Sequence, residues 1–235
     1  MGRQQKPGGK AGGKGVSRKD GTGSSSVVSG AAAPATGKTR SSPWPPDVTY
    51  LTSLVWGPDV LRAKEVYKKY KVSGNRPVEA SASAVRKTVR WQLIGDDNHP
   101  AKGEHGLFAA RRLEKGEHIV DYLGLVSLRG NESQTSDYSA SFGEENELAL
   151  DAEKMGNEAR MINDFRNTGK RANAVFDQYR DAAGDQKLGV FVGAHPINKG
   201  EEILVSYGKG FWANRVGDMA AFTGNGWGDE ENWKG

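Results

Sequence analysis

The 235-residue sequence contains no cysteine. Without cysteine a chain cannot form a disulfide framework or a zinc site with thiolate ligands, so we expect no disulfide and no metal. The composition is compatible with a reducing compartment. The sequence also lacks a run of about 20 apolar residues that would span a bilayer. No apolar signal-peptide core follows Met1, and we therefore expect no membrane contact.

Apolar residues are scarce, at 36% of the chain, and the deficit lies at the N-terminus. Residues 1–46 are mostly Gly, Lys, Ser, Ala, Pro and Thr. Such a composition cannot offset the entropy of ordering the backbone, so we predict a disordered basic tail over residues 1–46. The remaining part, about 190 residues, is long enough to bury a core.

Charge is distributed unevenly along the chain. Residues 1–40 hold eight basic residues and one acid, Asp20, whereas the rest holds 25 basic and 28 acidic residues. A loose basic tail attracts polyanions such as nucleic acid in a salt-dependent way. The alternative is a tail that only improves solubility. Its acid-poor composition is also compatible with an organelle transit peptide.

Residues 47–84 are predicted to be a helical flank. Pro58 suits the first turn of a helix over residues 58–70. The apolar positions of this helix recur at spacings of three and four, at Val60, Ala63, Tyr67 and Tyr70. Residues 72–84 read as a linker, and residues 85–94 then have the composition of a strand.

From Gly103 onward, short runs rich in Val, Ile, Tyr and Phe alternate with turns. We predict strands over residues 107–110, 118–126, 138–142, 148–151, 172–179, 188–194 and 202–207. Helices of 10–15 residues do not alternate with these runs, which argues against a doubly wound sheet. The pattern predicts a mainly β domain of several small sheets. Residues 217–235 form either a C-terminal tail or a flap.

Several motifs stand in a fixed order. They occupy residues 103–109, 113–117, 119–124, 156–160, 199–203 and 207–208, with two aromatic residues just beyond. Their order and spacing resemble the SET domain, the fold of most protein lysine methyltransferases. The resemblance implies a SET domain over residues 85–216, a fold of several small sheets with short helices.

The resemblance also implies S-adenosyl-L-methionine as the cofactor. A glycine-bounded loop allows the backbone to approach a ligand closely. The implied cofactor-binding residues are Gly103, His105, Gly106, Tyr138, Arg160, Asn163, Asp164, Phe211 and Trp212. Tyr207 is implied as the catalytic residue, with its hydroxyl at the junction of the methyl donor and the lysine. Two alternatives stay open: His105 as an ordinary loop histidine, and Tyr207 as an aromatic residue of the last core strand.

The chain departs from the family at two places. The family order Asn-His-Ser-Cys is replaced by Asn163, Asp164, Phe165 and Arg166. Asp164 is then expected either to accept from the cofactor's ammonium or to pair with Arg166. The Cys-rich segment that follows many SET domains is absent, which leaves Trp227 and Trp233 as candidates for the wall of the lysine channel.

Two further positions concern the substrate. Residues 125–137 are short and polar where the family places substrate-reading elements, which predicts light reading of the target. Val205 stands where the family has a larger aromatic residue, which predicts room for more than one methyl group.

The leading hypothesis is a protein-lysine N-methyltransferase that acts on a basic substrate such as a histone tail, in the nucleus. The net charge of −3 outside the tail suits a basic peptide. The alternatives are methylation of a non-histone protein, in the cytoplasm or an organelle, and a catalytically inactive SET fold that serves as an interaction module.

Overall fold

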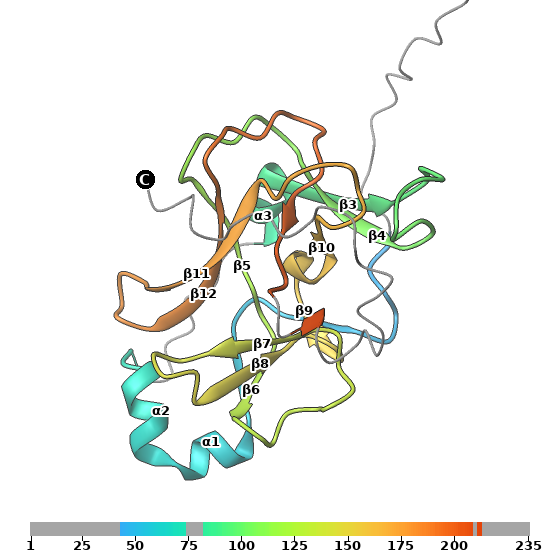
Figure 1. Ribbon diagram of the computed structural model, residues 1–235. Helices are drawn as coiled ribbons and strands as arrows, with labels where there is room; N and C mark the ends of the chain where they lie inside the picture. Colours follow the sequence, from blue (N-terminus) through green and yellow to red (C-terminus); the bar gives the residue numbers. More distant parts are fainter. Residues whose placement is uncertain (1–42, 74–81, 209–210, 213–235) are drawn as a thin grey trace, which may run out of the picture. The chain divides into compact units, whose positions relative to one another are not determined.

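A computed structural model describes residues 43–73, 82–208 and 211–212, and the structural statements below concern these residues. The described chain is mainly strand, arranged in several small sheets with a few short helices, as predicted (Figure 1). Most of the predicted basic tail and the segment that holds Trp227 and Trp233 lie outside the described residues.

The four-stranded sheet has the order β2-β6-β8-β7. Its strands are β2 (Val55–Trp56), β6 (Leu125–Leu128), β7 (Ser139–Phe142) and β8 (Leu148–Asp151). The last three pair in antiparallel fashion, whereas β2 adds in parallel to β6. Because β7 is at one edge of this sheet, the residues that precede it reach the site described below.

Two short helices, α1 (Pro58–Arg62) and α2 (Lys64–Tyr70), follow β2 and lie beside this sheet (Figure 1). The sequence predicted one helix, and the break at Ala63 corrects it, because Ala63 has φ −80° and ψ 67°, outside the helical region. Pro58 stands in the first turn as predicted. Val60 and Tyr70 are both fully buried, one on each side of the break, so the predicted apolar stripe does face the core.

The three-stranded sheet has the order β11-β12-β5, with all pairs antiparallel. Its strands are β5 (His118–Asp121), β11 (Ala174–Arg180) and β12 (Gln186–Val192). The predicted strand over residues 118–126 is divided between β5 and β6. Gly124 lies in the gap, where a Cβ atom would come within 2.3 Å of the carbonyl oxygen of Asp151. Only glycine permits this approach of two backbones.

Strands β3 (Val89–Leu93) and β4 (His105–Ala109) form an antiparallel pair. The predicted strand over residues 85–94 is wrong at its start, because α3 (Ala82–Thr88) occupies that part. Its alanines and basic residues favour helix, whereas alternation begins only at Val89. Leu93, at the end of β3, is 58% exposed.

Two-residue strands join distant segments. β1 (Thr49–Tyr50) runs parallel to β9 (Met155–Gly156), which leads into the 3-10 helix η1 (Glu158–Met161). β10 (Asn163–Asp164) runs parallel to β13 (Leu204–Val205). The strand predicted over residues 202–207 is therefore shorter than predicted. This pairing brings Asn163 and Asp164 beside the chain that continues to Tyr207.

The buried core draws on β3, β4, β5, β6, β8, β12 and η1. Trp44, which the sequence analysis placed in the tail, packs against this core. Its ring meets Tyr50 and Trp91 edge-on at 5.0 and 5.7 Å, so ordered packing begins before residue 47. Among the described residues, we find no helix with the length and apolar character needed to cross a bilayer.

Candidate active site

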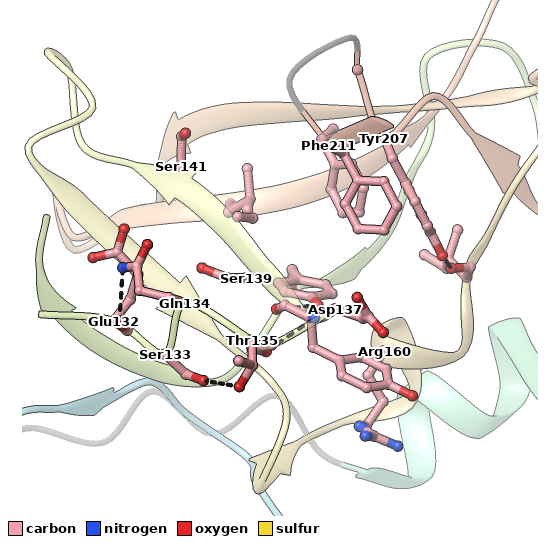
Figure 2. A pocket seen from close by; sticks show the side chains of 18 of the residues that line it. Glu132, Ser133, Gln134, Thr135, Asp137, Ser139, Ser141, Arg160, Tyr207 and Phe211 are labelled. Carbon is pink, nitrogen blue, oxygen red and sulfur yellow. Dashed lines mark hydrogen bonds between the residues drawn. The ribbon is translucent and has the colours of Figure 1, made fainter. Parts of the chain in front are cut away.

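A cavity of about 780 Å³ opens beside Tyr207. Figure 2 shows Tyr207 and Phe211 on one side of it and residues Glu132 to Thr135 on the other. It is lined by Tyr122, Arg129, residues 132–141, Arg160, Ile162, Phe176, Leu188, residues 206–208 and Phe211. The walls thus come from β7 and the loop before it, from η1, from β11 and β12, and from the chain after β13.

Aromatic rings form part of the lining. Tyr207 and Phe211 meet with ring centroids 4.7 Å apart, and Tyr122 and Phe176 meet edge-on at 5.5 Å. The Tyr122 hydroxyl donates to the carbonyl oxygen of Tyr138 at 2.8 Å, which fixes the backbone at the start of β7. Aromatic faces of this kind accommodate an alkyl chain and attract a cation.

Tyr207 is held by two hydrogen bonds, one from its hydroxyl and one from its backbone. Its hydroxyl donates to the carbonyl oxygen of Ile162 at 2.6 Å, and its backbone N–H donates to Asp164 Oδ2 at 2.8 Å. Since the hydroxyl proton is used in the first bond, the phenol oxygen retains lone pairs that can accept from another group. Both anchors belong to consecutive chain around β10.

Burial raises the pKa of Tyr207 above its ordinary value, and the nearby charges of Asp164, Glu104 and Asp137 raise it further. The phenol is therefore protonated throughout the physiological pH range. The charge of Asp164 is paired with Arg166, so Glu104 and Asp137 are the carboxylates that favour a cationic group near the hydroxyl.

Arg160, in η1, packs against the ring of Tyr138. Its Nε donates to the carbonyl oxygen of Ala152 at 3.0 Å and its Nη2 to that of Glu153 at 3.3 Å. The guanidinium carbon lies 4.1 Å from the centroid of the Tyr138 ring, within the range of a cation–π contact. Arg160 therefore orients a cavity wall.

The glycine loop predicted to hold the cofactor precedes and enters β4. Gly103 has φ +85°, a conformation that favours glycine, and the space beside its Cα is open. At Gly106, a Cβ atom would lie 2.9 Å from Glu202 Oε1 and 3.0 Å from the Phe108 ring. A larger residue at position 106 would therefore have to displace these side chains. The carbonyl oxygen of His105 accepts from Asn163 Nδ2 at 3.2 Å, which ties this loop to β10.

Glu202 links this loop to His99, a residue outside the recognised motifs. Asn163 Nδ2 donates to Glu202 Oε1 at 3.2 Å, and His99 Nε2 lies 3.1 Å from Glu202 Oε2. The N–H of Ala101 donates to His99 Nδ1, so the ring proton is on Nε2 and is donated to Glu202. Both side chains are buried.

The ten predicted site residues fall into two groups. Tyr138, Arg160, Tyr207 and Phe211 line the cavity. The others lie outside its lining: Gly103, His105, Gly106 and Asn163 belong to the loop and β10, and Trp212 is joined to Asp164 by a hydrogen bond of 3.3 Å. The two groups meet at β10.

Several lining residues were not predicted from the sequence. Tyr122 lies within a recognised motif, and its position there was the available signal. Phe176 and Leu188 lie on strands that are distant in sequence, and no local pattern marks them. In the described part of the chain, no group of three or more His, Cys, Asp or Glu residues is arranged to hold a metal ion.

The model of the family described as "SET domain" matches residues 104–208. No curated protein sequence matches the chain. Among solved structures, the chain is similar to "ctPRC2 in an autoinhibited conformation bound to S-adenosylmethionine", with 24% identity over 52% of this chain and a TM-score of 0.40. It is also similar to "Structure of ctPRC2 in complex with H3K27me3 and H3K27M", with 24% identity over 50% of this chain and a TM-score of 0.39. The matches cover 15% and 14% of those chains.

Proposed function

This chain carries a SET domain at residues 104–208, and from that premise we propose that it is an S-adenosylmethionine-dependent protein lysine N-methyltransferase. The observation that supports the proposal best is the Tyr207 phenol, which is anchored on Ile162 at the edge of an aromatic-lined cavity. An aromatic residue of an ordinary core strand would have no cavity beside it.

The residues present fit S-adenosylmethionine. Backbone groups are accessible at Gly103, where the space beside Cα is open, and an amide is present at Asn163, which is bonded to the loop. The rings of Phe211 and Trp212 provide flat surfaces for a nucleoside with an amino-acid end. The cofactor supplies an electrophilic methyl group on a sulfonium. In this proposal the cofactor lies on the Asn163 side of Tyr207, and the lysine enters from the cavity.

The protein's part in the reaction is orientation and charge. When bound, the cofactor would supply its methyl group to the lysine amine, with the carbon–sulfur bond breaking and its electron pair left on sulfur. The lysine ammonium first loses its proton to solvent. Because the pKa of Tyr207 is raised, the phenol is not the base; it accepts contacts through its oxygen and directs the amine.

The carboxylates around Tyr207 support a cationic substrate. The charges of Glu104 and Asp137 act on the phenol and favour a lysine head group or a sulfonium near it, whereas the charge of Asp164 is paired with Arg166. With the net charge of −3 outside the N-terminal tail, this supports a basic peptide, and we propose a histone tail and a nuclear location. Val205 is fully buried on β13 and is not part of the cavity lining, so transfer of more than one methyl group stays a prediction.

The test is methyl transfer from radiolabelled S-adenosylmethionine to recombinant core histones, with a non-histone basic protein in parallel. We expect label on a histone lysine, and mass spectrometry then counts the methyl groups. Label on the other protein alone would replace the histone substrate. Binding of S-adenosylhomocysteine by calorimetry without transfer to either protein would favour the inactive interaction module.

A further inference from the structure

Asp164 stands where the resemblance leads one to expect histidine, and its side chain is 6% exposed. Four N–H groups donate to its carboxylate. The Arg166 backbone N–H bonds to Oδ1 at 2.8 Å, whereas Arg166 Nη1, the Tyr207 backbone N–H and Trp212 Nε1 bond to Oδ2 at 2.6, 2.8 and 3.3 Å. These donors come from three segments of the chain.

An ionised carboxylate offers about four lone-pair positions. Three donors saturate Oδ2 and one donor bonds to Oδ1, so protein groups occupy most of the acceptor positions and one remains, on Oδ1. Of the two roles expected for Asp164, the pairing with Arg166 is the one that these contacts favour. The carboxylate is directed at the protein's own backbone and side chains.

We propose that Asp164 and Arg166 act as one positioning unit for Tyr207 and Trp212. The inference rests on the proposed function, because it takes the Tyr207 phenol as the catalytic group. Since the Tyr207 N–H and the Trp212 indole share one oxygen, the placement of the phenol and that of the aromatic segment are coupled. Asp164 thus acts through other residues, without contact to the reacting atoms.

Arg166 is what allows a carboxylate at this point. A buried ionised group is costly unless it is paired, and the Arg166 side chain is itself only 6% exposed. Its Nη2 also reaches Ser206 Oγ at 3.5 Å, next to Tyr207, and its guanidinium carbon lies 6.0 Å from the centroid of the Trp212 ring. The pair therefore touches both segments that Asp164 holds.

Histidine could not make the same set of bonds, because a neutral imidazole has one acceptor nitrogen. The replacements at positions 164 and 166 are therefore interdependent. Either residue changed alone leaves a buried charge without its partner, which a double-mutant cycle detects as non-additivity.

The test uses the full chain and two NMR signals, the backbone amide of Tyr207 and the indole N–H of Trp212. Trp212→Phe identifies the second signal among the six tryptophans. Asp164→Asn keeps the shape of the side chain but leaves one acceptor oxygen for four donors. We expect both signals to move, and the Tyr207 amide to exchange faster with solvent.

Activity provides the second readout. We expect kcat of Asp164→Asn to fall by roughly 10- to 100-fold through misplacement of the phenol, with a smaller change in the affinity for S-adenosylhomocysteine. Arg166→Gln should also lower kcat, and the double variant should be no worse than Asp164→Asn alone. Asp185→Asn is the matched control, since Asp185 is equally buried and paired with Lys71, and it should leave both NMR signals in place.

Unchanged Tyr207 and Trp212 signals in Asp164→Asn would overturn the proposal, whatever the activity. If Asp164→Asn does not fold, Trp212→Phe remains informative, because loss of the indole donor must shift the Tyr207 amide if the two share one acceptor. If the wild-type protein transfers no methyl group while Asp164→Asn still moves both signals, the proposed function is refuted and the positioning unit is supported.

Discussion

Replacement of Tyr207 by phenylalanine removes one oxygen from the edge of the cavity and leaves the ring. The lost hydroxyl donates to the carbonyl oxygen of Ile162 at 2.6 Å. The backbone N–H of residue 207 keeps its bond to Asp164, and the ring keeps its contact with Phe211. The perturbation is therefore confined to one hydrogen bond and one acceptor oxygen.

Two magnitudes follow from this geometry. Loss of one neutral hydrogen bond costs about 0.5–1.5 kcal/mol of folding free energy. Loss of a preorganised polar group at the reacting centre costs more in the rate, roughly 100- to 1,000-fold in kcat, because it acts only when the methyl group is transferred. Since the proposed position of the cofactor is on the other side of the phenol, its affinity should change by less than about threefold.

The assay combines methyl transfer to core histones with calorimetric binding of S-adenosylhomocysteine. Tyr179→Phe is the control, because the Tyr179 hydroxyl also donates a hydrogen bond, to Asp121 at 2.8 Å, yet the residue does not line the cavity. Both variants should lose a similar amount of stability, and Tyr207→Phe alone should lose turnover. Equal turnover in the two variants would refute the role given to the phenol.

Three further predictions concern the glycine loop, the tyrosines and the N-terminal boundary. Gly106→Ala places a Cβ atom against Glu202 and Phe108, so it should lower the free energy of unfolding by about 1–3 kcal/mol and weaken the binding of S-adenosylhomocysteine. Gly95→Ala, in open space, is the control and should change neither quantity. Denaturant titration measures the stability, and calorimetry measures the binding. Burial raises the pKa of Tyr50, Tyr122, Tyr179 and Tyr207, so these groups hold their protons in the folded state. Their contribution to stability is complete below the ordinary tyrosine value of 10.0 and is lost as the pH rises beyond it, so a melting temperature constant from pH 9 to 12 would contradict this. Deletion of residues 1–42 should leave the melting temperature unchanged. Deletion of residues 1–46 also removes Trp44 and should lower the free energy of unfolding by about 1–2 kcal/mol. Equal melting temperatures of the two truncations would contradict a stabilising contact of Trp44 with the core.

The sequence predicted the fold well because its information is local. Strand composition, turn glycines and ordered motifs are read from neighbouring residues, and strand β8 (Leu148–Asp151) appears with the predicted bounds. The errors arose where local and tertiary preferences differ. Residues 85–88 contain strand formers yet complete helix α3, and the predicted helix over residues 58–70 is interrupted at Ala63.

Site residues within motifs were within reach of the sequence, but their partners were not. His99 lies outside every recognised motif, and only the folded chain brings it to Glu202. The sequence alone did not decide the partner of Asp164, because a carboxylate can bond to a ligand or to a guanidinium. Its contacts with Tyr207 and Trp212, which are 43 and 48 positions away in the sequence, depend on the parallel pairing of β10 with β13.

Three consecutive residues around β10 connect the parts of the site. The carbonyl oxygen of Ile162 receives the phenol, the side chain of Asn163 bonds to the glycine loop and Glu202, and the side chain of Asp164 holds the end of β13. Successive side chains of a strand point to opposite faces, so Asn163 and Asp164 serve different partners because they are adjacent. A shift of one residue in the β10–β13 register would move the side chains of Asn163 and Asp164 to opposite faces of the pair. Tyr207 would then lose its bonds to Ile162 and Asp164. The fixed spacing of these three residues is therefore a geometric requirement of the site.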